Sequence, residues 1–321
     1  SFRKAIDLNH DYAEARYNLG MLQLLNGDYS AGWGNYDWRW KMPQYFRSRS
    51  DSGRPSWDGD SLQGKTIFIY PEQGVGDTVQ FVRYVPLITK LGAKVILEAP
   101  KQLLRLFRHM KISADLVGPG EPTPPFDCHA SLLDLPRLLR TSPDTIPSCP
   151  SYIEPDPNLV KYWENRLSFS REFRLGIVWA GNKAYQYDKK RSIDAHLFRP
   201  FVEIPGITVY SLQVGRNSES EKVFGDKVID VGALLTDFSD TAAIINKMDL
   251  VVTADTAVAH ISGAVGCQTR TLLPFIPDWR WFMGRDDTPW YSTMKLVRQP
   301  KLHDWETVIS QIHTELIKLT N

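Results

Sequence analysis

The sequence predicts an α/β protein with two Rossmann-like domains, each a doubly wound parallel sheet, that face a cleft and follow a short helical segment. Short β-rich runs alternate with helical stretches from Lys65 onward, and the alternation restarts after Pro155. Each half carries a glycine-containing loop after its first strand. Such alternation indicates parallel sheets with right-handed crossovers, which place ligands at the carboxyl ends of the strands. We therefore expect helices over 1–45, an N-terminal domain over 46–155 and a C-terminal domain over 156–321.

The first residues have the spacing of helices. Apolar side chains such as Ala15, Leu19 and Leu22 recur along one face, and a turn at 26–28 precedes a helix expected over 29–40. The segment resembles a tetratricopeptide repeat at Ala15, Leu19-Gly20, Gly27-Asp28-Tyr29 and Tyr36. An ordinary helical hairpin is the alternative. The segment would hold only one and a half such repeats, which bury too little core to be stable alone. We therefore expect either more repeats upstream or packing on the next domain.

The remaining elements follow from short apolar runs and the helical stretches between them. The expected strands are 66–70, 94–98, 114–117, 128–131, 174–179, 207–212, 227–231, 250–254 and 269–274. The expected helices are 78–91, 101–109, 159–167, 195–203, 239–248, 256–265 and 305–319.

Composition excludes several classes of protein. The chain has 38 basic and 37 acidic residues, which argues against a dedicated nucleic-acid binder or a polybasic membrane anchor. Its 3 cysteines form no Cys-x-x-Cys pair, so we expect no zinc site and a reducing, cytoplasmic location. No apolar run approaches the roughly 20 residues of a membrane span, and the first residues show no signal-peptide pattern. The chain begins within a helical pattern and without Met, so we expect a longer natural chain, whose upstream targeting signals stay open.

The loop Gly74–Thr78 is the first candidate for chemistry. It joins a predicted strand to a helix, where glycine allows close backbone approach and free N–H groups attract anions. It matches neither the dinucleotide-binding nor the P-loop pattern. Spacing favours Asp77 as a helix N-cap, and the alternative is a general base for an acceptor hydroxyl.

The second candidate is Thr253–His260, at the start of another helix. Asp255 can cap this helix, and the small residues after it leave the first amides open to an anion such as a diphosphate. His260 could donate to phosphate oxygens. A helix histidine without such a role is the alternative.

Two further segments could contribute to a site. The segment 179–182 follows the first strand of the second half and leads into a loop with four basic residues between 183 and 191. A cationic loop suits a pyrophosphate leaving group, although most charged runs are solvated loops. The aromatic runs 277–282 and 289–291 could line a pocket or serve as packing.

These segments together resemble the bacterial heptosyltransferase family (glycosyltransferase family 9, GT-B fold). The likeness is strongest to bacterial proteins that join tetratricopeptide repeats to such a domain, and it covers about 1–40 and 64–316. The motifs that carry it are Glu72–Phe81, Pro86, Val178–Asn182, Asp237–Ala242, Asp255–His260 and Leu273–Trp281.

The resemblance implies an inverting transferase that uses a nucleotide-activated sugar and needs neither a metal nor another cofactor. Asp77 corresponds to the family's general base, while the basic loop and the helix start after Asp255 would hold the donor diphosphate. The implied donor-binding residues are Gly76, Thr78, Gln80, Trp179, Gly181, Asn182, Lys189, Lys190, Arg191, Gln213, Asp240, Thr241, Asp255, Thr256, Ala257 and His260.

One departure from the family concerns the donor. The family usually has Gly-Pro where this chain has Ala257-Val258, which preserves backbone donation but leaves the donor's identity open. The helical segment suggests a protein acceptor, for example a surface or flagellar protein. The alternatives are a related module that binds a nucleotide or a protein without catalysis, and a sugar-nucleotide epimerase of the same fold.

Overall fold

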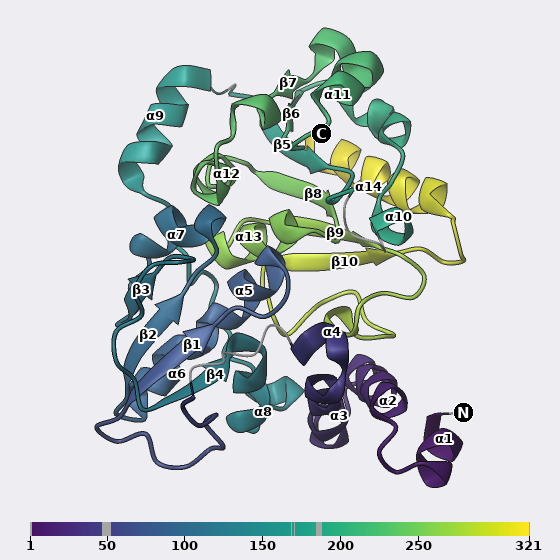
Figure 1. Cartoon of the computed structure of the whole chain (residues 1–321). Coiled ribbons are helices and arrows are strands. Elements are labelled where there is room, and N and C mark those ends of the chain that lie inside the picture. Colours follow the sequence, from purple (N-terminus) through teal and green to yellow (C-terminus); the bar gives the residue numbers. More distant parts are fainter. Residues whose placement is uncertain (1, 47–52, 168, 170, 184–187, 321) are drawn as a thin grey trace. The chain divides into compact units, whose positions relative to one another are not determined.

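The chain forms two compact units. The computed structural model describes residues 2–46, 53–167, 169, 171–183 and 188–320 (Figure 1). Unit 1 comprises Ser1–Ser148 together with Pro277–Arg285, and unit 2 comprises Cys149–Ile276 together with Asp286–Asn321. The short segment 277–285 therefore leaves the second half of the sequence to join the first.

Unit 1 begins with a helical segment, residues 2–46. Its elements are α1 (Phe2–Leu8), α2 (Ala13–Leu25), α3 (Tyr29–Tyr36), the 3-10 helix η1 (Asp37–Lys41) and α4 (Pro43–Phe46). The helices α2 and α3 pack closely, because a Cβ on Gly20 would lie 2.4 Å from the backbone nitrogen of Tyr36. The helix expected over 29–40 is an α-helix as far as Tyr36, and the chain continues from there as the 3-10 helix η1. The tetratricopeptide assignment stays a prediction.

A four-stranded parallel sheet forms the centre of unit 1, in the order β3-β2-β1-β4. Its strands are β1 (Thr66–Tyr70), β2 (Lys94–Glu98), β3 (Asp115–Val117) and β4 (Cys128–Ser131). The other elements are α5 (Val75–Phe81), η2 (Val82–Tyr84), α6 (Val85–Lys90), α7 (Lys101–Arg108), η3 (Leu132–Asp134), α8 (Leu135–Leu138), η4 (Pro143–Thr145) and η8 (Trp279–Trp281). The chain winds outward from β1 to β3 and then crosses to β4, so the strand order reverses between β1 and β4.

Unit 2 is built on a six-stranded parallel sheet in the order β10-β9-β8-β5-β6-β7. Its strands are β5 (Phe173–Val178), β6 (Ile207–Ser211), β7 (Ile229–Asp230), β8 (Leu250–Ala254), β9 (Thr269–Leu273) and β10 (Met294–Arg298). Counted from β5, this is the strand order of doubly wound nucleotide-binding folds, in which the order reverses between β5 and β8.

Helices cover the sheet of unit 2. They are α9 (Pro157–Leu167), α10 (Asp188–Arg191), η5 (Ala195–Glu203), α11 (Asn217–Phe224), η6 (Gly225–Lys227), η7 (Gly232–Leu234), α12 (Phe238–Ile245), α13 (Ala257–Val265) and α14 (Trp305–Thr320). Leu175 and Ile177 of β5 share one buried cluster with Phe198 of η5 and Ile312 of α14. Side chains on alternate positions of a strand face opposite sides of the sheet, so Gly176 and Val178 of β5 face away from this cluster.

The α/β prediction with parallel sheets is confirmed, with local differences. The helix expected over 78–91 is three consecutive helical pieces beginning at Val75, and the one expected over 195–203 is a 3-10 helix that contains Pro200. Proline lacks the N–H that an α-helix needs. The strand expected over 227–231 shortens to Ile229–Asp230, and β10 was not predicted. Within the described residues, no helix has the length and apolar character to cross a membrane.

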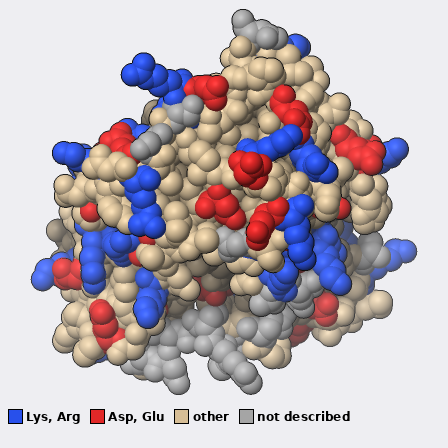
Figure 2. All heavy atoms as spheres, turned by 90° about the horizontal axis from the view of Figure 1, so that it is seen from above, with Lys and Arg blue, Asp and Glu red and all other residues tan. Residues whose placement is uncertain are grey.

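Figure 2 shows basic and acidic side chains mixed over the face in view, in keeping with the near-balance of charge.

Candidate functional site

Each unit has one place where its strand order reverses, and such places bind ligands in open α/β sheets. In unit 1 this is the carboxyl end of β1 and β4, and in unit 2 it is the carboxyl end of β5 and β8. The segments that the sequence singled out follow these strands: Gly74–Thr78 after β1, 179–182 after β5 and 255–260 after β8. We therefore describe each unit's candidate site by itself.

In unit 1, Asp77 lies in the first turn of α5. Its Oδ2 accepts a hydrogen bond from the N–H of Gly74 at 2.8 Å, and Gly74 is the N-cap residue. The assignment of Asp77 as the N-cap is thus wrong in position, because its carboxylate reaches back from inside the helix to the cap. Thr78 is buried, and its Oγ1 donates to the Gly74 carbonyl at 3.2 Å.

The other carboxylate oxygen of Asp77, Oδ1, forms an ion pair with Nη2 of Arg280. Arg280 is buried, and Asp278 Oδ1 accepts from its Nη1 at 2.8 Å and from its backbone N–H at 3.0 Å. The guanidinium also lies over the Trp279 ring, 4.5 Å from its centroid. The Asp77 side chain is 18% exposed, so its carboxylate remains accessible to solvent although both of its oxygens have partners.

The surroundings of Asp77 shift its acidity. Burial raises the pKa of the Asp77 carboxyl above its usual range, although the Arg280 guanidinium opposes this shift and the Asp278 carboxylate adds to it. A carboxylate whose pKa is raised, and whose direction is fixed by two partners, is suited to accept a proton from a hydroxyl.

Arg280 was absent from the residues predicted for the site. It lies 203 positions from Asp77, and no local pattern pairs two residues so far apart. The sequence signal that could have pointed to Arg280 was the presence of Asp278 and Arg280 within the aromatic run 277–282. Trp279, Trp281 and Phe282 of that run are buried in unit 1, which favours packing over the lining of a pocket.

In unit 2, hydrogen bonds to side chains hold the loop after β5. Oε1 of Gln213, which follows β6, accepts from the amides of Trp179 at 3.2 Å and Ala180 at 2.9 Å. The amide of Gly181 donates to Ser192 Oγ at 3.1 Å. A Cβ on Gly181 would lie 2.3 Å from Oδ1 of the buried Asp188, so a larger residue at this position would displace that carboxylate. Trp179, Gly181 and Gln213 therefore shape the loop rather than leave these amides open.

The basic loop has three exposed cations among the described residues, of which Lys183 precedes α10. Lys189 and Lys190 of α10 are exposed, whereas Arg191 pairs with Asp188 at 3.5 Å. Asn182 is exposed next to this loop. The rest of the predicted loop, 184–187, lies outside the described residues.

The helix α13 begins with Thr256 as its N-cap, whose Oγ1 accepts from the N–H of Val258 at 3.2 Å. The expectation that Asp255 caps this helix is wrong, since Asp255 stands one residue earlier. His260 is buried, and its Nδ1 lies 2.9 Å from the hydroxyl of Tyr291. The Tyr291 ring fits against the helix where a Cβ on Gly263 would be 2.4 Å from it.

Other predicted site residues are buried within their units. Asp240 Oδ1 accepts from Trp163 Nε1 at 3.0 Å and its Oδ2 from the Thr236 amide at 3.0 Å, so it ties α9 to α12. Thr241 donates to the Asp237 carbonyl at 3.4 Å. Gln80 is fully buried on α5, and its side-chain amide has no hydrogen-bond partner among the described residues.

Across the part of the chain that the structure describes, no three His, Cys, Asp or Glu side chains are grouped so that they could hold a metal ion.

Comparison with solved structures places the fold among glycosyltransferases. A glycosyl transferase of family 9 from Veillonella parvula superposes with a TM-score of 0.62 at 11% identity, covering 83% of this chain and 100% of that one. The ADP-heptose lipopolysaccharide heptosyltransferase II of E. coli gives 0.57 at 12% identity, covering 79% and 98%. At these identities the likeness defines the fold, an α/β fold of the heptosyltransferase type.

Sequence comparison gives a relative without a descriptive name. Protein FlbA of Caulobacter vibrioides is 24% identical over 95% of this chain. The chain spans about half the length of this curated relative, 55%. No model of a protein family matches the chain.

Proposed function

We propose that this chain is a glycosyltransferase that moves a sugar from a nucleotide-sugar donor to an acceptor hydroxyl, with inversion and without a metal ion. The fold that it shares with the family 9 transferase and heptosyltransferase II supports the class of reaction. The observation that carries the proposal is Asp77, held between the Gly74 amide and Arg280 and still partly exposed.

In the proposed reaction Asp77 is the general base. It takes the proton of the acceptor hydroxyl while that oxygen attacks the anomeric carbon from the face opposite the diphosphate. The bond between the anomeric carbon and the diphosphate oxygen breaks, its electron pair stays on the nucleoside diphosphate, and the configuration inverts. The hydrogen bond from Gly74 and the ion pair with Arg280 fix both carboxylate oxygens in direction, which is what a positioned base requires.

Unit 2 would hold the donor at the carboxyl ends of β5 and β8. The amides at the start of α13 and the exposed Lys189 and Lys190 would face the diphosphate and stabilise the charge that develops on it as it leaves. Ala257 and Val258 stand where the heptosyltransferase family usually has glycine and proline, and this change preserves backbone donation. An ADP-sugar is the first donor to test, since heptosyltransferase II has that donor class in its name.

The first test is ligand binding. Thermal unfolding would be followed with ADP, UDP, GDP, CMP and their common sugars, because a ligand at 100 times its dissociation constant adds about 2.7 kcal/mol of stability. One nucleotide is expected to raise the melting temperature clearly above the others. No shift with any of them at millimolar concentration would contradict the donor proposal.

The second test is turnover. Release of nucleoside diphosphate from the stabilising donor, with water as the slow acceptor, is expected to fall about 100- to 10,000-fold in Asp77→Asn, while the donor's thermal shift is kept. Full turnover in a folded Asp77→Asn protein would refute the base assignment. A protein that binds but never releases product would be a binding module, and one that isomerises the donor's sugar would be an epimerase. A protein acceptor and a cytoplasmic location stay predictions from the sequence.

A further inference from the structure

The carboxyl ends of β1 and β4 in unit 1 are filled by a side chain from the helical segment. Arg39 of η1 is 1% exposed. Its Nε and Nη2 donate to the two carboxylate oxygens of Glu72 at 2.7 and 2.8 Å, and its Nη2 also donates to Asp134 Oδ1 at 2.6 Å. Glu72 lies two residues after the end of β1, and Ser131, the last residue of β4, donates to it at 2.7 Å. The guanidinium thus lies where an open α/β sheet usually takes its ligand.

A second contact from the same segment holds the next residue of the loop. The hydroxyl of Tyr36 accepts a hydrogen bond from Nε2 of Gln73 at 3.0 Å. The Arg39 guanidinium stacks over the Tyr36 ring, 4.8 Å from its centroid. Glu72 and Gln73, which lead into Gly74, are therefore both fixed by helical-segment side chains.

The helical segment also supports the other partner of Asp77. The ring of Tyr36 lies 5.9 Å from that of Trp279, and the ring of Trp33 lies 5.4 Å from it, both between centroids. Trp279 directly precedes Arg280, and its ring lies under the Arg280 guanidinium. The helical segment therefore contacts the neighbours of both groups that bind Asp77. It holds the loop residues that precede Gly74, and it packs on Trp279, which precedes Arg280.

From this arrangement we propose that Arg39 and Tyr36 are positioning residues for Asp77, so that the helical segment is a working part of the Asp77 site. Neither residue contacts Asp77 in any described hydrogen bond or ion pair, and both act through the loop and through Trp279. The consequence for turnover rests on the proposed function. The consequence for the geometry of the loop does not.

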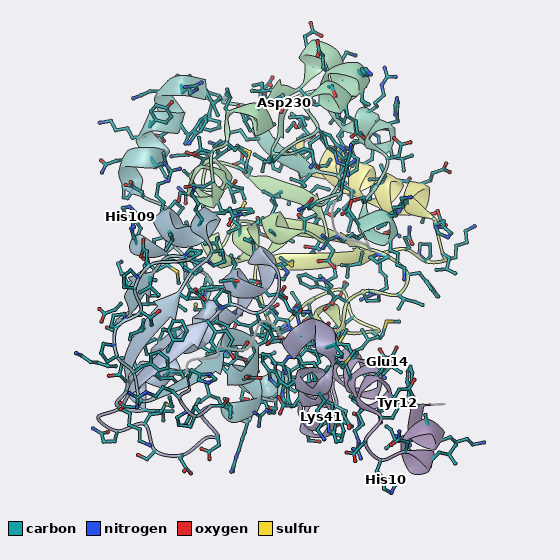
Figure 3. All side chains as sticks on the ribbon, viewed as in Figure 1. His10, Tyr12, Glu14, Lys41, His109 and Asp230 are labelled. Atoms are coloured by element: carbon teal, nitrogen blue, oxygen red, sulfur yellow. The ribbon has the colours of Figure 1, made fainter. Side chains whose placement is uncertain are left out.

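The variants have to separate positioning from folding. Arg39→Met alone leaves the buried Glu72 without its cation, which is strongly destabilising. The double variant Arg39→Met with Glu72→Gln removes the charges of the buried Arg39–Glu72 pair, while Asp134 keeps its hydrogen bond from Trp40 Nε1 at 3.1 Å. Tyr36→Phe removes one hydroxyl and keeps the ring. Lys41→Met is the matched control, because Lys41 is an exposed cation of the same η1 helix that pairs with an exposed aspartate (Figure 3).

Two readouts follow the site without any substrate. Hydrogen exchange of the amides in 72–78 is expected to accelerate at least about tenfold in the double variant and in Tyr36→Phe, because the loop loses its anchors. The Asp77 carboxyl carbon, assigned in an NMR spectrum by its loss in Asp77→Asn, is expected to titrate at a changed pH in the same variants. Lys41→Met is expected to match the unmodified protein in both.

Turnover gives the third readout. Donor hydrolysis is expected to lose at least about tenfold in kcat with KM for the donor unchanged, since the groups proposed to hold the donor diphosphate belong to unit 2. Folded variants with unchanged loop exchange, Asp77 titration and kcat would overturn the proposal. If the unmodified protein hydrolyses no nucleotide sugar, the proposed function fails, and exchange and titration alone still decide whether these residues position Asp77.

Discussion

Replacing Arg280 by methionine takes away the cation that faces Asp77 and keeps a side chain of similar length. Two unit charges about 4 Å apart interact by about 4 kcal/mol at the effective dielectric constant of about 20 that suits such sites. Observed shifts from a neighbouring opposite charge are about 1–3 pKa units. Because the Arg280 guanidinium opposes the burial that raises the pKa of Asp77, we expect Arg280→Met to raise that pKa further.

The sign of the pH dependence follows from this direction. In the folded variant Asp77 holds its proton more tightly than in the unfolded chain, where an aspartate has a pKa of about 3.9. Stability is therefore lost as pH rises from about 4 through the folded pKa, and the loss is complete above it. At about 1.4 kcal/mol per unit, Arg280→Met is expected to lower the free energy of unfolding at pH 7 by about 1.4–4 kcal/mol.

The assay is urea unfolding of four proteins at pH 7 and near pH 4: the unmodified chain, Arg280→Met, Asp77→Asn and the double variant. The double variant is expected to recover most of the loss, because it holds no unpaired carboxylate at position 77. This cycle also separates Asp77 from Asp278, which pairs with the same guanidinium and is more exposed. A loss that is equal at both pH values and unaffected by Asp77→Asn would refute the reasoning.

Two other predictions test packing and the second site. Gly20→Ala is expected to destabilise the protein by about 1–3 kcal/mol, since the added Cβ meets the Tyr36 backbone at 2.4 Å, while Gly34→Ala, with nothing within 4 Å, is expected to stabilise it by up to about 1 kcal/mol. Equal effects in urea unfolding would contradict the close packing of α2 on α3. Tyr291→Phe is expected to cost about 1–3 kcal/mol of stability by removing the partner of His260 Nδ1, and to raise the donor dissociation constant about tenfold if His260 binds phosphate. An unchanged dissociation constant would leave His260 with a structural role only.

Most strands were predictable because each is a short apolar run between turn-forming residues, as in Thr66–Tyr70 and Leu250–Ala254. The strand Met294–Arg298 was missed because two basic residues interrupt its apolar positions, one of them exposed. It lies at the edge of the sheet, where one side has no neighbouring strand to bury it.

The location of the candidate site was predictable and its internal partners were not. A glycine-containing loop after a strand indicates where Asp77 lies, because this position depends on local sequence. The pairing of Asp77 with Arg280, and of Glu72 with Arg39, depends on tertiary packing between distant segments, which no local spacing encodes. Gln213 and Asp240 were predicted from a resemblance, and their hydrogen bonds show that each orders a loop or joins two helices.

Residues 277–285 belong to unit 1 but are synthesised after most of unit 2. Asp77 leaves the ribosome 203 residues before its partner Arg280, which takes about 10–40 s at typical rates of translation. Over that interval Trp33 and Tyr36 lack Trp279, and the Asp77 carboxylate lacks its cation. A nascent chain released before residue 280 would carry the whole first sheet and Asp77 itself. It would still lack one of the two groups that hold the Asp77 carboxylate, so the Asp77 site is complete only after most of unit 2 has been made.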